Sequence, residues 1–177
     1  MNDEERTARV AHRAELTYGI AAAPEEVWRA IATAGGISSW MVPTTLEPRI
    51  GGEVSFDFGA FTLDGTVTAY DPGRRFAYEE PWPIAERAED VSPEMVEWFS
   101  RRRVPLERVY EDLAHATPIA TEFVIEARSG GSCVVRIVTS AYGAGADWEN
   151  EFFAEMVETT RPIWDGLAAY FARAASL

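Results

Sequence analysis

A run of apolar residues at helical spacing near the C-terminus constrains the fold more than any other feature of this sequence. Between Asp147 and Ala172 the apolar side chains recur with a period of about 3.6, which predicts one long amphipathic helix. Asp147 is the expected N-cap, and Pro162 is expected to bend the helix because it removes a backbone donor. An apolar face this broad has to be buried against another layer. That face contains Trp148, Phe152, Phe153, Met156, Ile163, Trp164, Leu167, Tyr170 and Phe171.

The layer that covers the helix is predicted by alternation with a period of two in the middle of the chain. Residues 54–58, 61–67 and 74–80 each place apolar side chains on one face and polar side chains on the other, with turn residues between the runs. Residues 15–20 alternate more weakly and are expected to form a first strand. These patterns indicate an antiparallel sheet with one apolar face and one wet face.

Short helices are expected after the first strand and again in the middle of the chain. Pro24-Glu25-Glu26 begins a helix, with proline at the first position and acids where the helix dipole favours them. The pair Gly35-Gly36 is expected to end it, and residues 37–41 to add one further turn. Residues 84–116 carry two more helix starts, at Ser92-Pro93-Glu94 and at Pro105, and are predicted to form a helical insertion between two strands.

The last two strands are predicted to form a hairpin that turns at Ser129-Gly130-Gly131. A two-residue loop would place Ile125 opposite Arg136, whereas a three-residue loop pairs Ile125 with Val135 on one apolar face. The pattern therefore selects the three-residue loop. All the elements fit an α+β fold of one domain, residues 1–177, in which a curved antiparallel sheet wraps around the C-terminal helix in a helix-grip arrangement.

The acidic composition argues against several classes of partner. The formal charge is -13 and the pI is about 4.6, whereas nucleic acids and anionic membranes are bound mainly by lysine and arginine. The single cysteine, Cys133, cannot form an intramolecular disulfide. Residues 1–9 lack the apolar core of a secretory signal, and no run approaches about 18 consecutive apolar residues. We therefore expect a cytoplasmic protein that binds neither nucleic acid nor membrane.

Several motifs in a fixed order resemble one protein family. The segments are Ala23-Pro24-Glu25-Glu26-Val27-Trp28, Ile37-Ser38-Ser39-Trp40, Glu47-Pro48-Arg49-Ile50-Gly51-Gly52, Val67 to Phe76 and Arg161 to Tyr170. Together they resemble bacterial members of the activator of Hsp90 ATPase homologue 1-like family, within the START-like superfamily. The resemblance covers Ala14 to Phe171 apart from the insertion, and it implies the helix-grip fold. The superfamily includes lipid carriers, plant hormone receptors, polyketide cyclases and co-chaperones, so fold alone does not settle function.

The titratable residues show no catalytic or metal-ligating pattern. His12 lies in the N-terminal lead-in and His115 near the end of an insertion helix, and neither has a second histidine or a cysteine at ligand spacing. Cys133 alternates onto the apolar face and is expected to be a buried, inert thiol. We expect no metal and no cofactor. Expected to be solvated are Glu151, Glu155 and Glu158 on the polar face of the long helix and the run Arg101-Arg102-Arg103.

The aromatic residues are the more informative candidates, and two arrangements fit them. We expect one set on the helix to oppose another on the sheet: Trp148, Phe152, Met156 and Ile163 against Phe56, Phe58, Tyr78 and Phe123. Either the long helix and the sheet pack into an ordinary core, or they stand apart over an apolar cavity of the kind that holds small ligands. Thr160 is a polar intrusion in the apolar face, and we expect its hydroxyl to bond back to its own helix. The candidate ligand-binding residues are Trp40, Phe56, Phe58, Tyr78, Phe123, Trp148, Phe152, Met156 and Thr160.

The leading hypothesis is a binding module for a small hydrophobic or lipid-like molecule, with the insertion as a partial lid. An enzyme resembling polyketide cyclases is the alternative from another class. It would need titratable groups inside the cavity, whereas alternation places Asp57, Asp64, Glu122 and Glu126 outside. A third hypothesis is a co-chaperone that acts through its surface on an ATPase, and a protein partner or a homodimer is compatible with the sequence.

Overall fold

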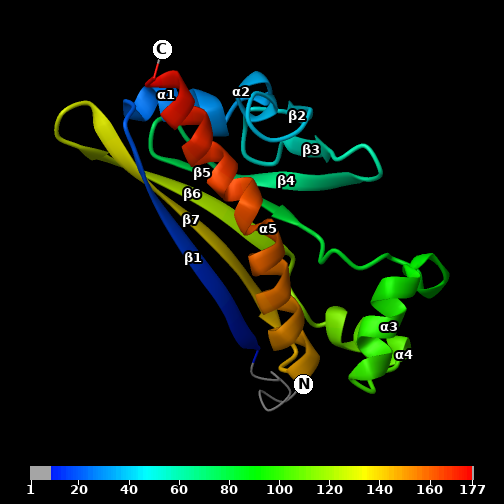
Figure 1. Cartoon of the computed structure of the whole chain (residues 1–177). Coiled ribbons are helices and arrows are strands. Elements are labelled where there is room, and N and C mark those ends of the chain that lie inside the picture. Colours follow the sequence, from blue (N-terminus) through cyan, green and yellow to red (C-terminus); the bar gives the residue numbers. More distant parts are fainter. Residues whose placement is uncertain (1–8, 177) are drawn as a thin grey trace.

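A seven-stranded antiparallel sheet curves around one long helix in the computed structural model, which describes residues 9–176 (Figure 1). The predicted α+β helix-grip fold is confirmed. Most of the N-terminal segment in which no secretory signal was expected lies outside the described residues. The strands are β1 (Val10–Ile20), β2 (Thr44–Leu46), β3 (Glu53–Asp57), β4 (Thr62–Asp71), β5 (Arg75–Glu80), β6 (Ile119–Arg128) and β7 (Ser132–Gly143). The helices are α1 (Pro24–Ile31), α2 (Ala34–Ser38), α3 (Pro93–Arg101), α4 (Leu106–Leu113) and α5 (Asp147–Ala174), with a short 3-10 helix η2 (Ala88–Asp90).

The strand order is β1-β7-β6-β5-β4-β3-β2, so the first strand of the chain lies beside the last. The β6–β7 hairpin has the predicted register, with Ile125 opposite Val135, and its three-residue loop places Gly130 and Gly131 at positive φ of 78° and 69°. Only glycine adopts such angles without strain, which explains the glycine pair.

β1 is longer than the predicted strand, because it begins at Val10 and pairs with β7 along its whole length. Its inner face starts with His12 and Ala14, and these residues do not produce the strong alternation that identifies a strand in the sequence. The lead-in position expected for His12 was therefore wrong, since this residue is part of the sheet.

Gly35 and Gly36 do not end α1, which stops at Ile31, and both lie within α2. Thr33 begins α2 by accepting a hydrogen bond from the Gly36 amide at 3.0 Å. A Cβ at position 36 would lie 1.8 Å from the carbonyl oxygen of Arg29, so glycine is required because α2 packs directly against the end of α1.

α5 crosses the concave face of the sheet, with α1 and α2 near its C-terminal end and α3 and α4 beside its start (Figure 1). The helix continues through Pro162, and the cap position is Ala146 instead of the expected Asp147. The reason is that the Glu149 carboxylate folds back and accepts the Ala146 amide at 3.1 Å, which satisfies the first turn without an Asp side chain. No helix within residues 9–176 combines the length and apolar character needed to cross a lipid bilayer.

The buried apolar side chains form three clusters along α5. The main core joins the sheet to α1, α2 and the C-terminal half of α5, where Trp164 and Leu167 are buried. The second cluster centres on Trp82 and Phe153. The third joins Phe99 and Val109 of the insertion to Trp148 at the start of α5, so the insertion is packed against that helix.

Candidate functional site

Aromatic side chains fill the space between the C-terminal half of α5 and the sheet. The ring of Trp164 lies 5.6 Å from that of Phe123 and 6.4 Å from that of Trp40, while Phe56 and Tyr78 are 5.2 Å apart. These five rings border a cavity of about 10 Å³, which is close to the minimum that holds one water molecule. The structure thus brings together four predicted residues, Trp40, Phe56, Tyr78 and Phe123, in an interior that side chains nearly fill. Trp164, which was not among the candidates, lies at its centre.

Two other predicted residues lie at the margin of this interior. Phe58 is half-buried beyond the end of β3, where its ring stacks on the exposed ring of Phe61 at 5.0 Å. Thr160 is half-buried on α5, and its hydroxyl donates to the carbonyl of Val157 at 3.2 Å. The expected bond from this hydroxyl to its own helix is confirmed.

Trp148, Phe152 and Met156 lie elsewhere, in the second and third clusters. The ring of Phe152 is 5.4 Å from that of Trp98 in the insertion, and Trp148 packs at 5.4 Å on Phe99. The expectation that they oppose Phe56, Phe58, Tyr78 and Phe123 was wrong. A helix rises about 1.5 Å per residue, so Trp148 and Trp164 are about 24 Å apart along α5 and cannot face the same part of the sheet.

Glu80, at the end of β5, turns a carboxyl group towards the concave face of the sheet. Phe76, Tyr78 and Glu80 alternate on one face of this strand, and Phe76 and Tyr78 are buried in the main core. The Oε2 atom of Glu80 is shielded from solvent and has no hydrogen-bond partner among the described residues. Burial raises the pKa of Glu80 to about 7, and burial together with the Glu80 charge raises the pKa of Tyr78 well above its usual value. The alternation that placed Tyr78 inside could have identified Glu80 two residues later.

Glu80 belongs to a band of polar side chains between the main core and the second cluster. Tyr78 and Trp82, two residues to either side of it, belong to those two clusters. Tyr78 pairs with Thr121 on β6, and Thr121 pairs with Thr139 on β7. We call Glu80, Thr121 and Thr139 the polar band.

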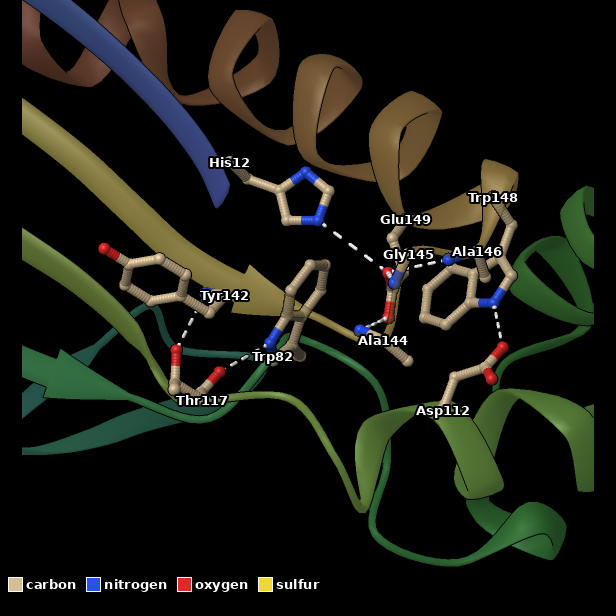
Figure 2. A network of polar contacts seen from close by, with 10 residues as sticks. All are labelled: His12, Trp82, Asp112, Thr117, Tyr142, Ala144, Gly145, Ala146, Trp148 and Glu149. Carbon is tan, nitrogen blue, oxygen red and sulfur yellow. Dashed lines mark hydrogen bonds and ion pairs between the residues drawn. The ribbon is translucent and has the colours of Figure 1, made fainter. Parts of the chain in front are cut away.

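A second buried polar group joins β1 to the start of α5 (Figure 2). His12 Nε2 lies 3.8 Å from Oε2 of Glu149, and no described residue accepts or donates a hydrogen bond at this nitrogen. The His12 ring packs on Phe153 at 5.4 Å and edge-on to Trp82 at 5.9 Å. The Glu149 carboxylate accepts three backbone N–H groups, from Ala144 at 2.9 Å, Gly145 at 2.8 Å and Ala146 at 3.1 Å. Sequence reasoning missed this pair because it placed His12 before the first strand.

Side-chain hydrogen bonds fix the two tryptophans beside this pair (Figure 2). The Nε1 atom of Trp82 donates to the carbonyl of Thr117 at 2.9 Å, and Nε1 of Trp148 donates to Oδ2 of Asp112 at 2.8 Å. Asp112 is 2% exposed and also pairs with Arg108 at 2.9 Å. These contacts hold α4 and the β5–β6 connection against the start of α5.

A surface groove of about 340 Å³ lies between the insertion and the ends of β5 and β6. Trp82 forms part of its wall, together with apolar residues that include Ile84, Tyr110 and Leu113. Trp82 is also part of the second cluster, so this side chain borders both the groove and that cluster.

The remaining titratable residues lie as the sequence predicts. Asp64, Glu122 and Glu126 bond to Ser55, Arg75 and Arg136 on the outer face of the sheet, and Asp57 bonds to the amide of Gly59. Cys133 is 1% exposed, and burial raises the pKa of its thiol. Among residues 9–176, no three His, Cys, Asp or Glu side chains gather as metal ligands.

Two of the exposed helix acids make a specific contact that the sequence did not predict. Glu151 and Glu155 accept from Arg102 at 2.7 Å and 2.9 Å, and the Arg102 guanidinium lies 3.5 Å over the ring of Trp98. Arg102 therefore joins the end of α3 to α5 and is not a free surface charge.

Comparison with known proteins gives one family and a common fold. A family model described as "Activator of Hsp90 ATPase homolog 1-like protein" matches residues 21–172. A protein from Mesorhizobium loti aligns with a TM-score of 0.64 at 13% identity, over 92% of this chain and 98% of that chain. The Aha1 dimer from Colwellia psychrerythraea gives a TM-score of 0.53 at 16% identity, over 89% and 96% of the two chains.

Norcoclaurine synthase from Thalictrum flavum, in complex with dopamine and hydroxybenzaldehyde, gives a TM-score of 0.54 at 12% identity, over 99% and 92% of the two chains. At these identities the likeness to solved structures shows the fold alone. Comparison with curated protein sequences found no match.

Proposed function

The chain belongs to the activator of Hsp90 ATPase homolog 1-like family, and from this premise we propose that it binds a small apolar molecule between α5 and the concave face of the sheet. The predicted site residues in the main core, Trp40, Phe56, Tyr78 and Phe123, would contact the ligand together with Trp164. Norcoclaurine synthase, which has a similar fold, was solved with two small aromatic molecules, and this supports the proposal without identifying the ligand.

The observation that carries the proposal is the way α5 is held against the sheet. Its backbone approaches the edge strand β1 more closely than any other strand. Towards β5 and β6 the distance is filled by aromatic side chains, such as Trp164 over Phe123. α5 is thus supported along one edge of the sheet, and side chains separate it from the central strands. A ligand can enter when those side chains move, without unfolding of the sheet.

The small volume of the cavity, about 10 Å³, requires such a movement, since pockets for drug-sized ligands are about 300 Å³ or larger. The half-buried residues Met156, Thr160 and Ile163 lie on α5 between the buried residues Phe153 and Trp164. They have fewer neighbours to displace than the fully buried Leu167, so we expect the ligand to enter along them.

Titration with Nile red, an uncharged dye whose emission depends on its environment, tests the proposal. The wild-type protein should bind about one dye per chain in a saturable manner. Thr160→Trp should fill the space under α5 and weaken binding, whereas Thr159→Trp, at the exposed neighbouring position, should not. Absence of saturable binding by the folded wild-type protein, or equal binding by both tryptophan variants, would overturn the proposed function.

An enzyme that transfers a proton is the second candidate, and Glu80 favours it. Alternation placed Asp57, Asp64, Glu122 and Glu126 outside the cavity, whereas Glu80 has a buried carboxylate oxygen. A group whose pKa lies near 7 can both accept and release a proton at neutral pH. If turnover of any substrate is found, its rate should change with pH near 7, and Glu80→Gln should remove that dependence.

A further inference from the structure

The Glu80 side chain is half-buried, and one of its two carboxylate oxygens is a buried acceptor. Its Oε2 atom is out of contact with solvent and lacks a partner within residues 9–176. Burial is the resolved cause of its raised pKa, with no contribution from a cationic side chain. A buried polar group left without a partner lowers stability, so its presence calls for an explanation such as a missing ion or ligand.

One neighbour of Glu80 in the sheet carries no side chain. The register of β4 and β5 pairs Thr66 with Glu79, which places Gly65 next to Glu80 with no side chain on that side. A Cβ at Gly65 would lie 2.6 Å from the Glu79 carbonyl oxygen, so the glycine is fixed by the close approach of the two strands. On the other side, Glu80 pairs with the apolar residue Ile119 of β6.

The groups packed around Glu80 restrict the charge of a ligand that could reach it. Tyr78, on the same strand, is the titratable neighbour whose pKa responds to the Glu80 charge. His12 and Glu149 face each other at 3.8 Å, and the His12 ring lies edge-on to Trp82. The neighbouring strands contribute uncharged residues next to Glu80, namely Gly65 from β4 and Ile119 and Thr121 from β6. On α5, the uncharged residues Met156 and Val157 pack against the cluster that contains Trp82 and Ile119.

We propose that Glu80 binds the ammonium group of an amphipathic amine whose apolar body lies among the aromatic side chains of the interior. This inference rests on the proposed function and specifies the chemical class of its ligand. An ammonium group supplies the donor that Oε2 lacks, and its charge balances the carboxylate in a region of low polarity. A carboxylate ligand would meet Glu80 with no basic group nearby and is disfavoured, while an alcohol would form only the weaker neutral hydrogen bond.

The pKa of Glu80, which is about 7, gives the inference a pH signature. An alkylamine stays protonated across the neutral range, whereas Glu80 ionises as the pH rises through its pKa. Affinity for an amine should therefore rise by roughly tenfold between pH 6 and pH 8, because the ionised fraction of the carboxyl rises by about that factor. Affinity for an alcohol of the same length should show no such rise.

Displacement of Nile red by octylamine, octanol and octanoate at pH 8 tests the inference. Octylamine should bind wild-type protein at least about tenfold more tightly than octanol, as expected for a hydrogen bond between charged groups, and octanoate should bind most weakly. Glu80→Gln should remove the preference for octylamine and its pH dependence and leave octanol affinity within about twofold. Glu79→Gln, which changes the adjacent carboxyl on the opposite face of β5, should behave as wild type.

The outcomes separate the two proposals. If octanol and octylamine both displace the dye with equal affinity in wild type and Glu80→Gln, the apolar site stands and the inference about Glu80 is wrong. If no probe binds the folded wild-type protein, both proposals fail. If Glu80→Gln does not fold, the affinities of the wild-type protein for octylamine and for octanol are compared as a function of pH. Equal pH profiles for the two ligands would contradict a role for a titrating carboxyl.

Discussion

The Nε2 atom of His12 lies 3.8 Å from Oε2 of Glu149, so an imidazole on the first strand meets a carboxylate in the first turn of the last helix. The side chains are 3% and 0% exposed. Gly143, on β7, is close to both groups, since a Cβ at that position would lie 2.4 Å from the Glu149 carboxylate and 2.7 Å from the imidazole. The start of β1, the end of β7 and the start of α5 therefore depend on one another.

Glu149→Ala should be strongly destabilising, because it leaves the amides of Ala144, Gly145 and Ala146 without their acceptor in a buried position. We expect a loss of about 3 to 5 kcal/mol in the free energy of unfolding, measured by urea denaturation. Glu158→Ala is the matched control on the same helix, where an exposed ion pair with Arg161 contributes less than about 1 kcal/mol. Similar losses for the two variants would contradict the capping role of Glu149.

His12 and Glu149 should be energetically coupled. His12→Phe keeps a ring against Phe153 and Trp82 but removes the nitrogen that faces the carboxylate. A double-mutant cycle with Glu149→Gln should give a coupling energy of about 0.5 to 3 kcal/mol, as for other residues in contact. Effects that add to within about 0.3 kcal/mol would show that the two side chains are neighbours without a mutual interaction.

Glu80 should make the stability of the protein fall as pH rises. Folding raises the pKa of this carboxyl from 4.5 to about 7, so the folded state holds the proton more tightly than the unfolded state. The free energy of unfolding should therefore decrease between those two pH values, by up to about 3 kcal/mol, and then level off. Glu80→Gln should match wild type at pH 4 and exceed it in stability at pH 8. Chemical denaturation at both pH values, with Glu79→Gln as the control, measures this difference, and parallel profiles for wild type and Glu80→Gln would contradict it.

The fold followed from sequence wherever one face of an element is strongly apolar. Period-two runs identified β3, β4 and β5, and the pairing of Ile125 with Val135 fixed the register of the β6–β7 hairpin. β2 was missed because its three residues are too short for a pattern. The end of α1 was predicted wrongly because Gly36 does not terminate a helix. Glycine is needed there because its backbone lies against Arg29, and the sequence alone does not reveal that contact.

The candidate site was harder to predict because it depends on position along an element as well as on its face. Helical periodicity assigned Trp148, Phe152 and Trp164 to one face of α5, but it did not show that the first two meet the insertion and the third meets the sheet. Alternation along β5 could have placed Glu80 on the inner face. His12 could not be placed in this way, because the first residues of β1 are defined only by their pairing with β7.

Phe152 should now behave as a packed residue, because the structure surrounds its ring with aromatic neighbours. The ring lies 5.4 Å from Trp98 and 6.2 Å from each of Phe99, Trp82 and Trp148. Phe152→Ala should lower the free energy of unfolding by about 3 kcal/mol, near the lower end for such changes because the side chain is half-buried. Phe61→Ala is the matched control, since Phe61 is 60% exposed and the variant should lose less than about 1 kcal/mol in the free energy of unfolding.

Nile red binding in the main core should survive Phe152→Ala, because that variant alters the contact between α5 and the insertion and leaves Trp164 and Phe123 in place. A loss near zero would mean that the insertion does not pack on α5 in solution, and loss of dye binding in a folded variant would place the ligand beside the insertion instead of under Trp164.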